Sequence, residues 1–255
     1  MNFEEWHDKE TDRIFTREVK LYFADCDRNK KIHLVNLLQL TADTGVEDYH
    51  QRGITFDKLQ EKNYAFLVSR VAMRFHRIPC ANEFLTIKTW ERGIKGMQVF
   101  RDYEVFDTNT KELLVSGRSS WLIVNPSTKR IIRPKDFSMR DIPSSEKLVD
   151  SLECGKIKST EKAVLFDKRK IRYSDLDANG HMNNARYGAY IIDSLPPEYQ
   201  DYNFTDFRIN YAHEAGRGDV ISMYGEIDAE SKKITITGKH DDVTCFESEL
   251  FYGNS

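Results

Sequence analysis

The chain has 255 residues, 40% of them hydrophobic and including 15 Phe and 12 Tyr, which is enough for a sizeable buried core in one or two domains. Its 38 Lys and Arg nearly balance 41 Asp and Glu, so the overall charge of -3 favours neither a nucleic-acid-binding protein nor a binder of acidic polymers. No apolar run reaches the roughly 18 residues of a membrane span, and the N-terminus is acidic where a signal or transit peptide is basic and apolar. We therefore expect a cytoplasmic globular protein.

The sequence pattern of the first half predicts a helix followed by a meander of strands. Apolar residues recur at helical spacing from Leu34 to about His50, and Gly53 provides a stop. The period then changes to two, and β-branched and aromatic residues alternate with turn clusters. We expect antiparallel strands at residues 65–77, 83–91, 97–107 and 112–125.

A charged connection and a second copy of the same plan follow. Residues 134–160 carry little strand signal and include the sequence Pro143-Ser144-Ser145-Glu146, which is typical of a surface linker. A helix is predicted from Ala185 to Leu195, where Pro196 and Pro197 end it. Four more strands are predicted at residues 203–211, 219–227, 232–238 and 244–252.

Each half thus contains a strand, a helix and four strands. A long helix followed by an antiparallel meander predicts an α+β unit in which the sheet wraps around the helix, and two such units can pair edge to edge. We place the boundary near residue 150, with one domain at 1–150 and the other at 151–255. A tandem repeat supplies the pairing within one chain, although a homodimer of the whole chain remains an open alternative.

The repeat is visible in the residues that precede each helix. The stretch from Tyr22 to His33 aligns with the stretch from Tyr173 to His181 if the first copy carries two extra residues before its histidine. The counterpart of Glu214 falls at or near Ile78, so the first copy lacks an acid. We therefore expect catalysis in the second half.

A polar segment of the second copy forms the candidate site. In an extended segment, residues at two-residue spacing project to one side, so Asp177, Asn179 and His181 would face one small volume. Asn183 or Asn184 would cap the following helix, whose first N–H groups would point at the same volume. The alternative is a turn with Asx hydrogen bonds and a capping asparagine.

A second polar cluster ends a strand about thirty residues later. It contains Glu214, followed by Gly216 and Arg217. Taken alone, Glu214 could be a solvated turn carboxylate. His213 is expected to be a bystander, because adjacent side chains on a strand face opposite ways.

Together these two motifs resemble the acyl-ACP thioesterases. The resemblance rests on Asp177-x-Asn179-x-His181-Met182-Asn183-Asn184-x-x-Tyr187 and on Tyr211-x-x-Glu214-x-Gly216-Arg217, in the same order as in that family. It implies two tandem hot-dog domains over nearly the whole chain. The absence of a transit peptide suggests the bacterial branch.

The resemblance implies hydrolysis of a fatty acyl-ACP thioester to a free fatty acid, with no cofactor. Glu214 would be the general base for water, Asn179 and His181 would orient the water or the carbonyl, and Asp177 would hold its neighbours. N–H groups near Asn183 and Asn184 would stabilise the oxyanion. Plant members carry a cysteine where this chain has Ala215, so a thiol nucleophile is not expected.

Three other classes of function stay open. They are an acyl-CoA thioesterase on the same fold, a hot-dog dehydratase or hydratase, and an acyl-binding module without activity. Cys26, Cys80, Cys154 and Cys245 form no C-x-x-C pair, and the seven histidines form no H-x-x-x-H pattern, so free thiols and no metal site are predicted.

Basic residues suggest where acyl carrier protein would bind. The candidates for contacts with its phosphopantetheine phosphate and acidic surface are Lys168, Arg169, Lys170, Arg172, Arg186 and Arg217. A solvated strand face is the alternative for each of them. An acyl slot under the first helix would be lined by Leu37, Leu38, Val46, Phe66, Val68 and Met73, which could equally be ordinary core residues.

Overall fold

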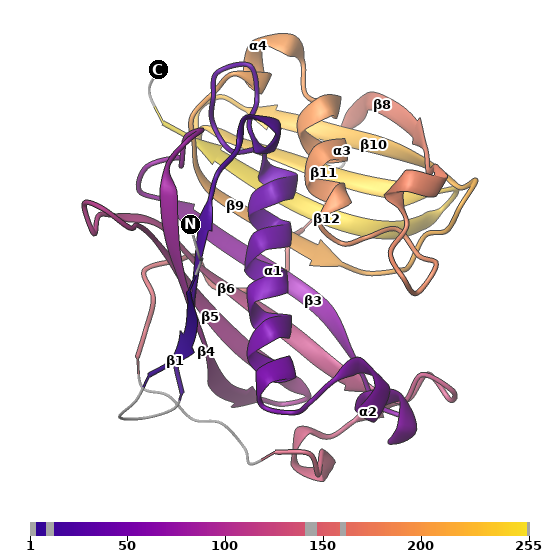
Figure 1. Ribbon diagram of the computed structural model, residues 1–255. Coiled ribbons are helices and arrows are strands. Elements are labelled where there is room, and N and C mark those ends of the chain that lie inside the picture. The colour runs from indigo at the N-terminus through magenta and orange to yellow at the C-terminus, as the bar shows by residue number, and fades with distance from the viewer. Residues whose placement is uncertain (1–3, 9–12, 141–146, 159–161, 254–255) are drawn as a thin grey trace.

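The structure is a computed structural model, and it describes residues 4–8, 13–140, 147–158 and 162–253. One antiparallel sheet runs through the molecule, with the helices α1 and α3 on the same face (Figure 1). The helices are α1 (Leu34–Gln51), α2 (Phe56–Glu61), α3 (Arg186–Ser194) and α4 (Pro197–Gln200).

The strands are ordered β1-β2-β4-β5-β6-β3-β9-β12-β11-β10-β8 across the sheet, and β7 pairs with β6 beside this path. Their bounds are β1 (Glu5–His7), β2 (Phe15–Lys20), β3 (Ala65–Phe75), β4 (Phe84–Lys95), β5 (Gln98–Asp107), β6 (Leu113–Val124), β7 (Ile131–Ile132), β8 (Val164–Lys170), β9 (Phe204–Tyr211), β10 (Val220–Asp228), β11 (Lys233–His240) and β12 (Val243–Tyr252).

The two halves join through β3 and β9, which confirms the predicted edge-to-edge pairing. Ala72 lies opposite Arg208 in the antiparallel register, and Val71 and Met73 lie opposite Ile209 and Phe207. The strand order on the two sides of this seam is matched, with β6 beside β3 and β12 beside β9. The two α+β units are therefore related by an approximate two-fold axis near the Ala72–Arg208 pair.

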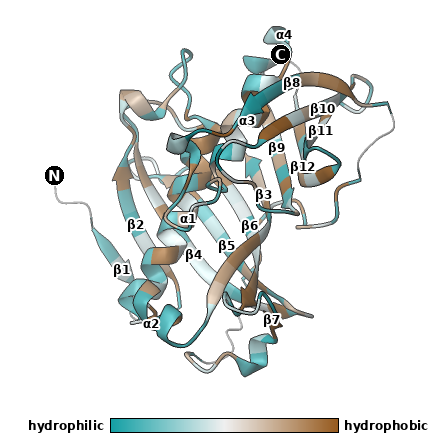
Figure 2. Cartoon of the chain, turned by 90° about the vertical axis from the view of Figure 1, so that its right-hand side faces the viewer, coloured by the Kyte–Doolittle hydropathy of each residue, from teal (hydrophilic) through white to brown (hydrophobic). Residues whose placement is uncertain are grey.

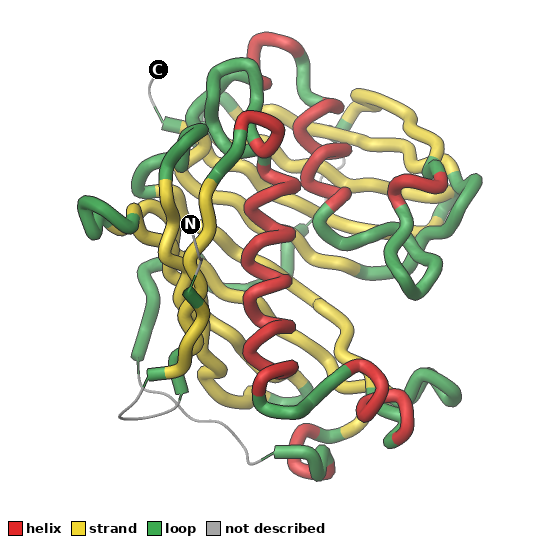
Figure 3. Tube along the Cα trace, in the orientation of Figure 1, coloured by secondary structure: helices red, strands yellow, loops and turns green. Residues whose placement is uncertain are grey.

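The larger of two hydrophobic core clusters is shared by both halves. Leu37 and Leu38 of α1 belong to the same buried cluster as Tyr187 and Ile191 of α3. Figure 3 shows the two helices as red coils against the yellow strands. They approach closely at Gly188, where an added Cβ would come within 3.0 Å of Leu38 Cδ1. The apolar stripes predicted on the helices therefore face the sheet and each other.

The predicted elements are present with small shifts at their ends. The first helix begins at Leu34 as predicted, and the second begins at Arg186, one residue later than predicted. All eight predicted meander strands occur. The short elements β1, α2, β7 and α4 were not predicted.

The predicted linker contains a 3-10 turn at Pro134–Asp136, and its part at residues 147–158 has neither helix nor strand. Pro143-Ser144-Ser145-Glu146 lies outside the described residues, and the boundary near residue 150 stays a prediction. Over the described parts of the chain, no helix is both long and apolar enough to cross a membrane.

Candidate active site

The polar segment before α3 is a closed loop, so its predicted extended form is wrong. A 3-10 turn at Tyr173–Asp175 leads into it, and Leu176 pairs with Met182 across the loop. The N–H of Asp177 donates to the carbonyl oxygen of His181 at 2.9 Å. Gly180 has a φ of +81°, which glycine adopts easily. This geometry turns the chain back on itself within a few residues.

The carboxylate of Asp177 explains the turn. Its Oδ1 accepts the backbone N–H of Asn179 at 2.8 Å, which is an Asx turn of the kind that competes with extended structure. The alternative weighed for this segment is therefore realised. The amide of Asn179 is exposed, and its side chain makes no hydrogen bond within the described parts of the chain. The prediction that Asp177, Asn179 and His181 share one volume through two-residue spacing has no support in this loop.

The loop does bring His181 to Glu214. Nε2 of His181 lies 3.6 Å from Oε2 of Glu214. The backbone holds the two segments together, because His181 pairs with Gly216 and the N–H of Met182 donates to the carbonyl of Ala215 at 2.9 Å. The two side chains are 46% and 49% exposed, so water reaches both. An imidazole and a carboxylate thus face each other on an accessible surface, which is the arrangement of a general acid–base pair.

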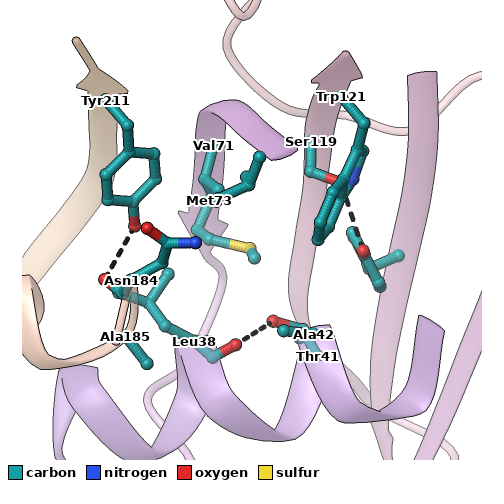
Figure 4. Close-up of a pocket in the computed structure, with 12 residues that line it drawn as sticks. Leu38, Thr41, Ala42, Val71, Met73, Ser119, Trp121, Asn184, Ala185 and Tyr211 are labelled. Atoms are coloured by element: carbon teal, nitrogen blue, oxygen red, sulfur yellow. Dashed lines mark hydrogen bonds between the residues drawn. The ribbon is translucent and has the colours of Figure 1, made fainter. Parts of the chain in front are cut away.

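The asparagines before α3 have different tasks. The predicted capping of α3 by Asn183 or Asn184 is wrong, because the N-cap residue is Ala185, which makes no side-chain cap hydrogen bond. Asn183 instead forms an Asx turn just before the helix, in which its Oδ1 accepts the N–H of Ala185 at 2.9 Å, and its carbonyl accepts the N–H of Arg186 at 2.9 Å. The carbonyl of Asn184 accepts the hydroxyl of Tyr211 at 3.0 Å (Figure 4). The N–H of Asn184 has no backbone acceptor in the part of the chain that the structure describes. It is therefore available to a ligand beside the helix start.

An apolar pocket adjoins this helix start and is built from both halves. It has a volume of about 50 Å³ and is bounded by Asn184, Ala185 and Tyr211 on one side. The first half supplies the opposite wall, including Leu38 of α1 and Met73 of β3 (Figure 4). The complete lining is Leu38, Thr41, Ala42, Val68, Val71, Met73, Tyr103, Ser119, Trp121, Asn184, Ala185 and Tyr211.

Half of the predicted acyl slot belongs to this pocket. Leu38, Val68 and Met73 line it. Leu37 is a core residue, Phe66 packs against a separate hydrophobic cluster, and Val46 is 60% exposed. The helical spacing identified the stripe of α1, but it did not show which members face the pocket.

The first copy of the loop corresponds to the second without an insertion. Lys31 pairs with Cys80 as His181 pairs with Gly216. The backbone bond from Asp27 to Lys31, at 2.8 Å, mirrors the bond from Asp177 to His181. The alignment with two extra residues before His33 was therefore wrong, and Lys31 is the structural counterpart of His181.

Two further correspondences follow from this register. Ile78 precedes Cys80 as Glu214 precedes Gly216, so Ile78 stands where the acid stands in the second half. His33 takes the position of Asn183, because each donates its N–H to the carbonyl of the aspartate that ends the 3-10 turn. The first copy thus lacks both members of the His–Glu pair, and the predicted loss of its acid is explained.

One cysteine lies closer to the site than the sequence indicates. The carbonyl of Cys245 on β12 accepts the N–H groups of Ala212 and His213, next to Glu214. Its thiol is only 2% exposed, and burial raises its pKa. Ala215 is itself buried. A thiolate nucleophile is therefore disfavoured by environment rather than by distance.

The predicted basic cluster divides into engaged and free cations. Arg169 forms an ion pair with Asp193 and lies over the ring of Tyr190, and Arg186 lies 3.7 Å from Asp175. Lys168, Lys170, Arg172 and Arg217 are exposed and have no carboxylate partner among the described residues. Arg217 lies 5.8 Å from the centroid of the exposed ring of Tyr173. Four cations therefore remain for a partner.

The free lysines sit on a sheet edge. β8 is the last strand of the sheet, and Figure 2 shows it hydrophobic at its start and hydrophilic toward its end. Lys168 and Lys170 share one face of this strand, whereas Arg169 faces α3. Among the residues that the structure describes, no group of three or more His, Cys, Asp or Glu side chains is placed to hold a metal ion.

Comparisons with known proteins agree over most of the chain. The family described as "Acyl-ACP thioesterase N-terminal domain" matches residues 12–139, and the one described as "Acyl-ACP thioesterase C-terminal domain" matches residues 158–246. The chain is 27% identical over 223 residues to an acyl-[acyl-carrier-protein] hydrolase of Cuphea viscosissima, covering 82% of this chain and 54% of that protein.

A palmitoyl-acyl carrier protein thioesterase of Arabidopsis thaliana is 29% identical over 216 residues, covering 80% of this chain and 52% of that protein. The chain therefore spans about half the length of these curated relatives.

Solved structures share the fold. A crystal structure described as an acyl-ACP thioesterase from Bacteroides thetaiotaomicron superposes with a TM-score of 0.87 at 23% identity, over 96% of this chain and 100% of the other. The 12:0-ACP thioesterase from Umbellularia californica superposes with a TM-score of 0.80 at 16% identity, over 95% and 98%. The predicted pair of tandem hot-dog units is thereby confirmed.

Proposed function

Because the chain belongs to the acyl-ACP thioesterase family, we propose that it hydrolyses the thioester of a fatty acyl group carried on acyl carrier protein. The products are a free fatty acid and the thiol of the carrier's phosphopantetheine. The observation that carries this proposal is the His181–Glu214 pair, 3.6 Å apart and open to water beside an apolar pocket. We place the reaction in the cytoplasm and assign it no cofactor.

The reaction needs an activated water, a stabilised oxyanion and a protonated leaving group. Glu214 acts as the general base and takes a proton as the water oxygen bonds to the thioester carbonyl carbon. The carbonyl oxygen becomes an oxyanion, and the free N–H of Asn184 at the helix start supports its charge. When the tetrahedral intermediate collapses, the C–S bond breaks and the proton passes to the departing sulfur.

The other loop residues hold this arrangement. His181 orients the water or the carbonyl through the imidazole that faces Glu214. Asp177 stabilises the loop through its Asx turn, which is the supporting part expected of it. Asn179 is assigned to the side of the loop that a substrate would cover, since its exposed amide is left without a partner in the described loop.

The acyl chain enters the pocket between the halves. Its lining comes mostly from α1, β3 and β6, so acyl recognition belongs to the first half and catalysis to the second. Asn184, the residue of the proposed oxyanion position, is itself part of the pocket lining. The carrier protein approaches the edge at β8, where Lys168, Lys170, Arg172 and Arg217 meet its acidic surface and the phosphopantetheine phosphate.

The decisive experiment incubates the purified chain with mixed acyl-ACPs, and with the corresponding acyl-CoAs, and measures released thiol and free fatty acids. Glu214→Gln should lower the rate by roughly 10²- to 10⁴-fold while the protein stays folded. His213→Ala is the matched control, because this neighbouring histidine bonds to the Thr244 carbonyl and takes no part in the pair.

Each alternative gives a different result in that experiment. Faster turnover of acyl-CoA identifies a CoA thioesterase, and a new absorbance from an enoyl product identifies a dehydratase or hydratase. Tight binding without thiol release identifies an acyl-binding module. Near wild-type hydrolysis by folded Glu214→Gln would overturn the assignment of the base.

A further inference from the structure

A second and larger cleft lies at the inactive copy of the loop. It has a volume of about 570 Å³ and opens between the loop that precedes α1 and the segment α3–α4 of the other half. In Figure 1 this loop and α4 stand side by side at the top of the molecule. Clefts of roughly 300–1,000 Å³ are the usual size of small-molecule sites. No step of the proposed hydrolysis uses this cleft.

The cleft is the two-fold counterpart of the acyl pocket. Leu34 and Val35 line it where Asn184 and Ala185 line the pocket, following the loop register that equates Lys31 with His181. The strands show the same two-fold relation, about the seam where Ala72 pairs with Arg208. Paired members of the two linings, pocket residue first, are Tyr211 and Phe75, Leu38 and Gly188, Ala42 and Ile192, Val71 and Phe207, and Ser119 and Leu250.

At the loop end of the cleft, the two positions that hold His181 and Glu214 in the second half carry different residues. Lys31 replaces the imidazole, and Ile78 replaces the carboxylate that would activate water. A lysine beside an apolar wall has no base to transfer a proton from water, but it can hold an anion. The wall continues through Phe75 and Phe207. A lysine beside an apolar wall is complementary to an amphiphile that carries one negative charge.

The carboxylates that line the cleft are already engaged. Asp27 accepts the N–H groups of Asn29 and Lys31, and Asp193 pairs with Arg169. Asp201 lies near Lys31, but its oxygens accept bonds from Arg28 and Asn29.

One cation, Lys31, is left for a ligand. Nζ of Lys31 donates to Oδ1 of Asn203 at 2.6 Å, and no ion pair between Lys31 or His33 and a carboxylate occurs among the described residues. Lys31 thus offers its remaining donors, and the exposed His33 adds a polar ring at the mouth.

We propose that this cleft binds a long-chain free fatty acid, with the carboxylate on Lys31 and the chain between α3 and the apolar wall. The choice of a fatty acid rests on the proposed function, because that reaction releases this anion within the same molecule. The bound acid occupies a site distinct from the acyl pocket, so the product has a second place to accumulate on the enzyme.

The test is equilibrium dialysis of radiolabelled dodecanoate, kept below its micelle concentration, against the full chain. Two equivalents should bind, one in the acyl pocket and one in the cleft. Lys31→Met should weaken one of them about tenfold or more, which is the usual effect of losing a charge-assisted hydrogen bond, and Lys31→Arg should restore it. Lys30→Met is the matched control, since Lys30 neighbours Lys31 but does not line the cleft.

A second variant tests the cleft at a position away from Lys31, so that a local disturbance of the loop by Lys31→Met can be recognised. Ala189 lines the cleft on α3, so Ala189→Trp should fill it and reduce binding to one equivalent. Uncharged dodecanol should not compete for the Lys31-dependent equivalent. Equal affinities of the wild type, Lys31→Met and Lys30→Met for every bound equivalent, or competition by dodecanol for the Lys31-dependent equivalent, would each overturn the inference.

Thiol release from dodecanoyl-ACP, measured on the same preparations, separates the two proposals. A chain that releases no thiol but loses one dodecanoate equivalent in Lys31→Met would refute the hydrolase and keep the cleft. A chain that releases thiol and binds dodecanoate with no dependence on Lys31 would do the reverse.

Discussion

The hydroxyl of Tyr211 donates a hydrogen bond to the carbonyl oxygen of Asn184 at 3.0 Å. This bond ties the end of β9, which leads to Glu214, to the loop that carries His181. The ring of Tyr211 also packs edge-on against Tyr187 of α3, with centroids 5.8 Å apart. The first half has Phe75 and Leu34 at the two corresponding positions, so the bond is made in the half that has the His–Glu pair and has no counterpart in the other.

Tyr211→Phe should therefore loosen the approach of Glu214 to His181 without removing either. We expect kcat on acyl-ACP to fall roughly 3- to 10-fold with little change in KM, because one neutral hydrogen bond contributes about 1 kcal/mol. Steady-state kinetics and a thermal melt measure the two effects. Tyr224→Phe is the control, since this ring contacts Lys239 on the neighbouring strand. An unchanged kcat would mean that the bond does not position the site.

Cys245→Ala should retain most of the activity. The thiol is buried and burial raises its pKa, so it stays protonated and cannot act as a nucleophile near neutral pH. Hydrolysis by the variant, and insensitivity of the wild type to iodoacetamide, are the measurements. A folded Cys245→Ala protein that had lost more than 100-fold in rate would restore the thiol mechanism and displace Glu214 as the base.

The sequence predicted the long elements because their periodicity is strong. Leu34, Leu37 and Leu38 mark the start and the buried face of α1, and the meander strands follow from alternation. The missed helix α2 has a signal in hindsight, since Thr55 caps it by accepting the N–H of Lys58. The strands β1 and β7 are too short for a period to appear.

The roles assigned to the site residues stay predictions, whereas the geometry around them was predicted only in part. The two motifs were expected to meet at one site, and His181 and Glu214 do lie 3.6 Å apart. The repeat was aligned by matching His33 to His181, whereas the backbone equates Lys31 with His181. Identical residue types can occupy different loop positions, so only hydrogen-bond registers reveal the correct pairing. The approach of Cys245 likewise depends on strand pairing that one sequence does not specify.

The exposed lysines of β8 give a prediction about the partner. The double variant Lys168→Glu, Lys170→Glu should raise KM for acyl-ACP about tenfold at low salt, because two cations facing an acidic carrier become anions. Hydrolysis of a small acyl thioester without carrier protein should stay unchanged. The double variant Lys62→Glu, Lys95→Glu makes the same charge change on the first half and is the control. Equal effects of the two double variants on the KM for acyl-ACP would refute docking at β8.

The buried pair of Asp48 and Arg101 gives a prediction about stability and pH. Oδ2 of Asp48 accepts from Nη2 of Arg101 at 2.8 Å, and the two side chains are 3% and 4% exposed. Arg52 and His7 bond to the other oxygen, at 2.7 and 2.9 Å. Burial alone would raise the pKa of Asp48, but Arg101 and these two partners outweigh it, so the pKa is lowered.

A carboxylate whose pKa is lowered by folding stabilises the folded state above its unfolded pKa of about 3.9, and this contribution is lost as the pH falls through the folded value. Asp48→Asn should therefore cost about 3–5 kcal/mol at pH 7, since it leaves the Arg101 charge buried and unpaired by a carboxylate. The difference from the wild type should shrink below about pH 4, where the wild-type carboxyl also becomes neutral.

Urea denaturation of both proteins between pH 3 and pH 7 measures this difference. Asp57→Asn, at an exposed position of α2, should cost less than about 0.5 kcal/mol throughout. The double variant Asp48→Leu, Arg101→Met should recover much of the loss, because it removes both buried charges together. A constant cost of Asp48→Asn across the whole pH range would show that packing, rather than the ionised carboxylate, accounts for its effect.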